Sequence, residues 1–137
     1  MEYVAEAVQS EGMRFEVQMG GHASVSDYPL DPAATGAGPR PLEMLLGSLA
    51  ACAGGTLVAL LRRGQQPLRG LKVIARGQRR TEHPTVFTSI ALEFAVTGAI
   101  DPAVVAQTIE QAETRVCPVW AMLKPTTPIT ASFTIEP

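Results

Sequence analysis

The two cysteines, Cys52 and Cys117, carry the most reactive side-chain chemistry in the chain. A cysteine thiolate is a nucleophile, a metal ligand and a partner in disulfide exchange. Two cysteines far apart in the sequence do not form the framework of a disulfide-rich secreted domain. The chain also lacks a basic start followed by an apolar run, which is the pattern of a secretory signal. We therefore expect both thiols to be reduced at rest, and no disulfide scaffold.

Other roles for these cysteines fit the sequence less well. A zinc site would have to combine them with His22 and His83, but no pair of these residues has the spacing of zinc ligands. A cysteine-protease nucleophile needs a histidine beside the thiol, and both histidines fall in or beside predicted turns. Two buried and unreactive cysteines remain the ordinary alternative to a redox pair.

Cys52 lies in the segment 41–63, "PLEMLLGSLAACAGGTLVALLRR", which is uncharged from Met44 to Leu61. Such a segment is just long enough to cross a bilayer. Its glycines, alanines and hydroxyl residues make it a weak candidate for insertion, and the amphipathic strands around it need an apolar partner. Pro41 suits the first helical turn and Gly64 suits its end. We predict a central core helix, and its uncovered face is expected to meet a second copy of the chain.

Cys117 lies where a helix is expected to break. Asp101 and Pro102 are typical of a helix start, and the apolar stripe of "DPAVVAQTIEQAETRV" predicts a helix over 101–116. The residue before a proline avoids helical geometry, so Cys117–Pro118 interrupts this helix. If a new turn begins at Pro118, its free N–H groups favour a thiolate at Cys117.

The remaining patterns predict one α+β domain over residues 1–137. At 46% hydrophobic and 18% charged residues, the composition is that of a soluble globular protein. Two glycines, Gly20 and Gly21, predict a tight hairpin between two of the strands. The predicted element order is β-β-β-α-β-β-α-β, with no repeats. Strands are expected near 3–8, 14–19, 22–26, 71–80, 86–96 and 129–136.

The charge pattern argues against nucleic-acid and membrane partners. The net charge is −2, and seven of the eleven Lys and Arg residues lie between Arg62 and Arg80. No aromatic residues are interleaved with them to stack on bases. We interpret this cluster as a helix end and the solvent face of a strand, with an anion-binding groove as the alternative.

Three stretches, "GPRPLEMLLGSLAACAGGTL", "RRTEHPTVFTSIALEFAVTG" and "ETRVCPVWAMLKPTTPITASFTI", resemble the OsmC/Ohr family of osmotically inducible and organic hydroperoxide resistance proteins. The resemblance runs from about Pro39 to the C-terminus. It implies an intertwined homodimer whose long central helices are wrapped by curved sheets with strands from both chains. It also implies a cytoplasmic antioxidant peroxidase acting on organic hydroperoxides, with no bound cofactor. A lipoyl-type or other external thiol would then supply the reducing equivalents.

The resemblance assigns roles to the two cysteines. It places Cys52 at the peroxidatic position, where a sulfenic acid forms, and Cys117 at the resolving position, where a Cys52–Cys117 disulfide closes. The rival hypothesis is an OsmC-fold dimeric protein that binds a small hydrophobic ligand and has little peroxidase activity. Convergence of an arginine and an acid on Cys52 would favour the enzyme.

The acid and the arginine are the remaining site residues implied by the family. Its best-characterised peroxidases carry a glutamate ten residues before the first cysteine; here that position is Leu42, and Glu43 lies nine before, as in an OsmC-like subgroup. Nine residues place Glu43 about 180° around the helix and about 13 Å along it from Cys52. Glu43 is therefore expected to act in the partner subunit's site, or only to stabilise the helix dipole. The family's activating arginine is expected at Arg14, with Arg40 as second choice.

Overall fold

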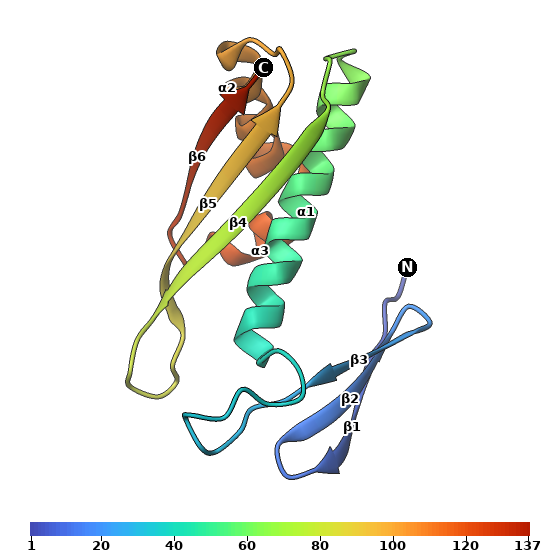
Figure 1. The fold of residues 1–137 in the computed structure, drawn as a ribbon, viewed down its shortest axis with the longest axis vertical. Coiled ribbons are helices and arrows are strands. Elements are labelled where there is room, and N and C mark those ends of the chain that lie inside the picture. The colour runs from blue at the N-terminus through green and yellow to red at the C-terminus, as the bar shows by residue number, and fades with distance from the viewer. The chain divides into compact units, whose positions relative to one another are not determined.

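The computed structural model describes all 137 residues, which form two compact units, Met1–Leu45 and Leu46–Pro137. Their elements follow one another in the order traced by colour in Figure 1. The order confirms the α+β class and the predicted sequence of strands and long helices. The elements are β1 (Ala5–Glu11), β2 (Arg14–Met19), β3 (His22–Ser26), α1 (Pro41–Arg63), β4 (Gly70–Arg79), β5 (Phe87–Thr97), α2 (Pro102–Gln111), the π-helix η1 (Ala112–Val116), α3 (Pro118–Leu123) and β6 (Ile129–Glu136).

The N-terminal unit contains a three-stranded antiparallel sheet in the order β1-β2-β3. Gly20 and Gly21 form its second turn with φ of +57° and +80°, which confirms the predicted two-glycine hairpin. The first strand begins at Ala5, not at Tyr3 as predicted. Ala5 pairs with Met19, the last residue of β2, so residues before it have no strand to pair with.

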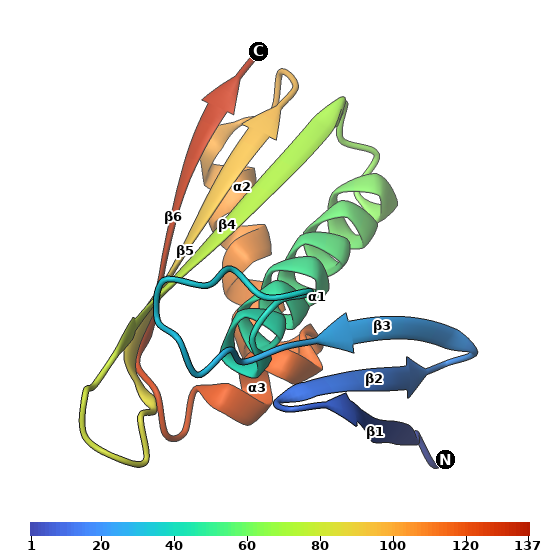
Figure 2. The same cartoon turned by 60° about the horizontal axis from the view of Figure 1, so that its bottom comes forward.

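The C-terminal unit contains a second sheet, in the order β4-β5-β6. β4 and β5 form an antiparallel pair, whereas β5 and β6 run parallel. A parallel pair needs a crossover connection, and here α2, η1 and α3 provide it. Figures 1 and 2 show the helices on one face of this sheet. The buried hydrophobic residues are Leu49, Ala53, Leu57, Leu61, Ile90, Leu92, Phe94, Val96, Ile100, Val105, Ile109, Ala112, Cys117 and Trp120.

Helix α1 supplies one side of this core. Its buried residues are Leu49, Ala53, Gly54, Leu57 and Leu61. By length and composition α1 is long and apolar enough to cross a membrane, but the core helix of a soluble protein passes the same test. Its packing against the sheet makes it a core helix of this unit.

The segment between β5 and α3 differs from the single helix predicted over 101–116. Asp101 accepts a hydrogen bond from the N–H of Ala103 (2.8 Å) and so caps α2 as expected. However, α2 ends at Gln111, and its last turn widens into the π-helix η1. Cys117 has extended backbone geometry (φ −72°, ψ 108°), which confirms the predicted break before Pro118.

Gly98, after β5, gives a prediction about stability. Its φ is +143°, and a Cβ there would overlap the carbonyl oxygen of Pro67. We expect Gly98→Ala to lower the free energy of unfolding by about 2 kcal/mol or more, measured by urea titration. Gly12→Ala is the control, because Gly12 also has positive φ (+53°) but open space around it. Equal losses in both variants would show that backbone conformation alone, not the Pro67 contact, sets the cost.

Candidate functional site

The C-terminal unit brings its two cysteines together. The Sγ atoms of Cys52 and Cys117 lie 3.1 Å apart, although the residues are 65 positions apart in the chain. Both are free thiols. Cys117 is buried, with 1% of its surface exposed, whereas Cys52 is partly exposed and packs against the core from α1. Of the predicted site residues, these two are adjacent.

Two flanking helices fix the backbone of Cys117. Its N–H donates to the carbonyl oxygen of Ala112 (2.9 Å), which closes η1. Its own carbonyl oxygen accepts from the N–H of Ala121 (3.1 Å), which opens α3. The local sequence explains this arrangement, because Pro118 excludes helical geometry at the preceding residue and suits the first position of the next helix. The thiol is therefore held at a rigid junction between two helices.

Burial raises the pKa of the Cys117 thiol above its ordinary value of 9.0, and the hydrogen bond and charge of Cys52 act in the same direction. The N–H groups of Trp120 and Val119, in the first turn of α3, lower it. They form no regular capping hydrogen bond to the side chain. The expected influence of the new helix is thus present, but desolvation is larger. Cys117 stays protonated and donates its S–H to the sulfur of Cys52.

This geometry suits chemistry between sulfur atoms. A disulfide has an S–S distance of about 2.05 Å, so the two sulfurs need approach by only about 1 Å to bond. Cys52 is the more accessible of the two thiols, so a reagent from solvent reaches it first. No lysine or arginine is among the groups that act on the pKa of Cys117. The chain has no group of three His, Cys, Asp or Glu side chains placed to hold a metal ion.

Arg14, the predicted activating arginine, belongs to the N-terminal unit and pairs with two carboxylates there. Its Nη1 lies 3.2 Å from Oε1 of Glu11, and its Nε lies 3.6 Å from Oδ2 of Asp27. Asp27 is 8% exposed. Arg40, the second choice, places its guanidinium 5.2 Å from the centre of the Tyr28 ring, a cation–π contact. Assignment of either arginine to the thiols stays a prediction.

Glu43 also belongs to the N-terminal unit, at the start of α1. Its Oε1 accepts a hydrogen bond from the backbone N–H of Arg40 (2.9 Å). This is half of a capping box, in which the third helical residue reaches back to the capping residue. The contact supports the helix-stabilising role that the sequence left open for Glu43. A role in a partner subunit's site stays a prediction.

Trp120 is a site residue that the sequence analysis missed. It is 1% exposed, follows Cys117 by one helical turn, and stacks on Phe94 with ring centres 6.5 Å apart. Its backbone N–H lowers the pKa of Cys117, and its side chain belongs to the same buried core cluster as Cys117. The available signal was that the single tryptophan of the chain lies three residues after a cysteine.

The unequal exposure of the two thiols predicts an order of alkylation. At pH 8 with a small excess of iodoacetamide, we expect Cys52 to be modified about tenfold faster than Cys117, which is buried and has a raised pKa. Peptide mapping by mass spectrometry at successive times measures both rates. In urea, where both thiols are exposed, the rates should become similar. Faster modification of Cys117 in the folded protein would contradict this picture of the site.

Comparisons with known proteins by sequence and by structure point to the same protein family. The family described as OsmC-like protein matches residues 34–132. Protein YhfA of Escherichia coli K12 is 32% identical over 126 residues, which cover 91% of this chain and 92% of that protein. An OsmC-like protein from Mycoplasma pneumoniae superposes with a TM-score of 0.89 at 21% identity, covering 100% of this chain and 99% of that one. An organic hydroperoxide resistance protein from Elizabethkingia anophelis superposes with a TM-score of 0.79 at 16% identity, covering 99% and 97%. The chain therefore belongs to the OsmC/Ohr family.

Proposed function

We propose that this protein is a thiol-dependent peroxidase that reduces organic hydroperoxides to alcohols. The observation that carries the proposal is the 3.1 Å contact between the sulfurs of Cys52 and Cys117. Membership of the OsmC/Ohr family and similarity in fold to proteins named for organic hydroperoxide resistance support it.

The proposed cycle has three balanced steps. The Cys52 thiolate attacks the distal oxygen of the hydroperoxide, the O–O bond breaks, and the alkoxide takes a proton to leave as the alcohol. The sulfur of Cys117 then attacks the resulting Cys52 sulfenic acid, forms the disulfide and releases water. An external dithiol, of lipoyl or another type, reduces this disulfide and is itself oxidised.

The order of the two cysteines in this cycle follows from their surroundings. The partly exposed Cys52 can meet a peroxide, and it is the sulfur that accepts the hydrogen bond. The buried Cys117, with its raised pKa, holds its proton until the sulfenic acid forms beside it. A protonated thiol does not compete for the peroxide, because the thiolate is the nucleophile.

The proposal includes a cytoplasmic homodimer. Small residues, Gly47, Ala51, Gly55 and Ala59, recur at every fourth position of α1 and are exposed. A Cβ added at Gly47 or Gly55 would meet no other atom within 4 Å. Such a surface on an otherwise apolar helix is suited to close packing against another helix, here α1 of a second copy.

A large side chain at Gly55 tests the dimer. We expect Gly55→Leu to convert the dimer to a monomer, because the leucine keeps the two helices apart, while its space within one chain is open. Light scattering coupled to size-exclusion chromatography measures the mass. Gly55→Ala, which keeps the side chain small, should stay dimeric. Wild-type protein that elutes as a monomer would contradict the homodimer directly.

The peroxidase proposal is tested by counting thiols in the reduced wild-type protein. One equivalent of cumene hydroperoxide should remove both free thiols of each chain within seconds to minutes and release one equivalent of cumyl alcohol. Oxidation that is equally slow in wild type and in Cys52→Ser would contradict the enzyme. That outcome would favour the rival binding protein for a small hydrophobic ligand.

A further inference from the structure

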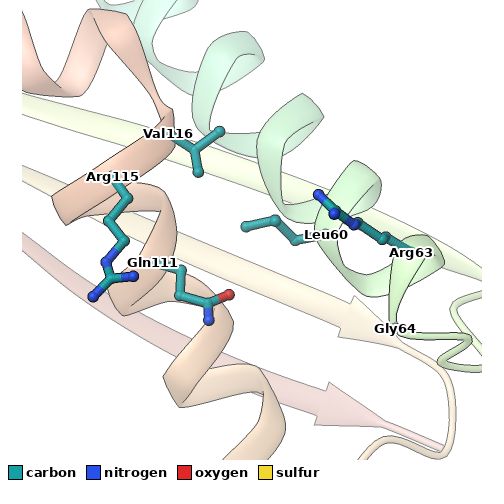
Figure 3. Close-up of a pocket in the computed structure, with 6 residues that line it drawn as sticks. All are labelled: Leu60, Arg63, Gly64, Gln111, Arg115 and Val116. Atoms are coloured by element: carbon teal, nitrogen blue, oxygen red, sulfur yellow. The ribbon is translucent and has the colours of Figure 1, made fainter.

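A second candidate site lies at the C-terminal end of α1. It is an open cavity of about 400 Å³ between the C-terminal end of α1 and the continuous helical segment formed by α2 and η1. Figure 3 shows Leu60 and Val116 pointing toward each other across it, with Gln111 beside them. Its lining residues are Leu60, Arg63, Gly64, Gln111, Arg115 and Val116.

The two arginines of this cavity have no partners within the chain. The ion pairs of Arg14 and Arg76 lie elsewhere in the chain. Arg63 and Arg115 form no hydrogen bond or ion pair, in contrast to Arg69, Arg76 and Arg80. In a chain of net charge −2, two free guanidinium groups beside one cavity are available to an external anion.

The end of α1 does not cancel this positive charge. A helix C-terminus carries about half a negative elementary charge on its free carbonyl groups. Here the carbonyl oxygens of Leu60, Leu61 and Arg62 accept hydrogen bonds from Gly64, Gln66 and Gln65 respectively. Two full positive charges therefore outweigh the helix end, and the cavity favours an anion.

The apolar lining narrows the kind of anion. Val116 is 49% exposed although it is hydrophobic, and Leu60 is partly exposed on the opposite wall. A small inorganic anion would leave both side chains in water, whereas an aliphatic chain would cover them. The planar guanidinium groups match a carboxylate, which accepts two parallel hydrogen bonds from one arginine. The volume lies within the usual range for small-molecule pockets.

We propose that this cavity binds an aliphatic carboxylate, with its chain between Leu60 and Val116 and its carboxylate on Arg63 and Arg115. The site is separate from the thiol pair and does not depend on the proposed peroxidase activity. It is, however, connected to that pair along the chain, because Arg115 and Val116 directly precede Cys117.

Titration calorimetry with decanoate tests the proposal on the full-length reduced protein and on its Cys52→Ser variant. We expect saturable binding with equal affinity in both, because the site does not use the thiol. Arg63→Gln and Arg115→Gln should each weaken binding about tenfold, since each removes a charge-assisted hydrogen bond. Arg62→Gln is the matched control on the same helix. Arg62 does not line the cavity, so the affinity of this variant for decanoate should stay within about twofold of wild type.

Two further probes measure separately how much the aliphatic chain and the negative charge of the ligand contribute to binding. Decanol, which has the chain without the charge, and inorganic phosphate, which has charge without a chain, should both bind at least about tenfold more weakly than decanoate. Absence of saturable decanoate binding below its aggregation threshold would overturn the proposal. Binding that survives the double variant Arg63→Gln/Arg115→Gln would overturn it too, as would phosphate binding as tight as decanoate binding. Circular dichroism of each variant checks that the fold is retained.

Discussion

Cys52→Ser is expected to abolish steady-state consumption of cumene hydroperoxide in the presence of an excess of dithiol, lowering kcat/KM by about a thousandfold or more. Serine keeps nearly the same shape, but its hydroxyl group is not ionised near neutral pH, so the variant has no nucleophile at this position. The buried Cys117 cannot take over, because it is 1% exposed and its pKa is raised. Loss of peroxide is followed by a colorimetric assay and alcohol formation by chromatography.

Cys117→Ser is the matched variant, with the same substitution 3.1 Å away. Its first turnover should proceed, because Cys52 is intact, and should stop at the sulfenic acid. Dimedone should therefore label Cys52 in Cys117→Ser and label neither residue in Cys52→Ser. Full activity in Cys52→Ser, or rapid labelling of Cys117 in that variant, would reverse the proposed roles of the two cysteines.

Much of the fold could be predicted because it depends on local signals. Gly20 and Gly21 can adopt positive φ, Asp101 and Pro102 suit a helix start, and Pro118 stops the helix before it. Alternating apolar residues predicted β5 because the sheet buries one face. The π-helix η1 and the parallel pairing of β5 with β6 depend on how distant segments pack, and no local pattern encodes them.

The candidate site was predictable to a smaller degree. The family resemblance paired Cys52 with Cys117, but the burial of each thiol depends on how the helices pack in three dimensions. The more buried thiol is Cys117, because the junction of η1 and α3 belongs to the hydrophobic core together with Trp120, whereas Cys52 packs against that core from α1. The roles of the charged residues Arg14 and Glu43 were harder to predict than the pairing of the cysteines. Arg14 pairs with Glu11 and Asp27, and Glu43 caps its own helix, and such contacts compete with any role at the thiols.

Oxidation of the thiol pair is expected to stabilise the fold strongly. A Cys52–Cys117 disulfide would close a loop of 65 residues, and the chain-entropy account gives about 4 kcal/mol for a loop of this size. The adjacent sulfurs in the reduced fold mean that little of this gain is lost to rearrangement. Urea unfolding of oxidised and dithiothreitol-reduced protein at pH 7 measures the difference. Cys117→Ser cannot form the disulfide, so its free energy of unfolding should be the same under oxidising and reducing conditions.

The difference in free energy of unfolding between the oxidised and the reduced protein is expected to depend on pH. The folded state holds the Cys117 proton more tightly than the unfolded state, because burial raises its pKa above 9.0. The contribution of the Cys117 proton to the free energy of unfolding of the reduced protein is therefore fully present below pH 9.0. It is lost as the pH rises through the folded-state pKa. The oxidised protein has no thiol to titrate, so the gap between the two forms should widen above pH 9.0. A gap that narrows with rising pH, or oxidised protein no more stable than Cys117→Ser, would contradict a buried thiol beside Cys52 that closes into a disulfide.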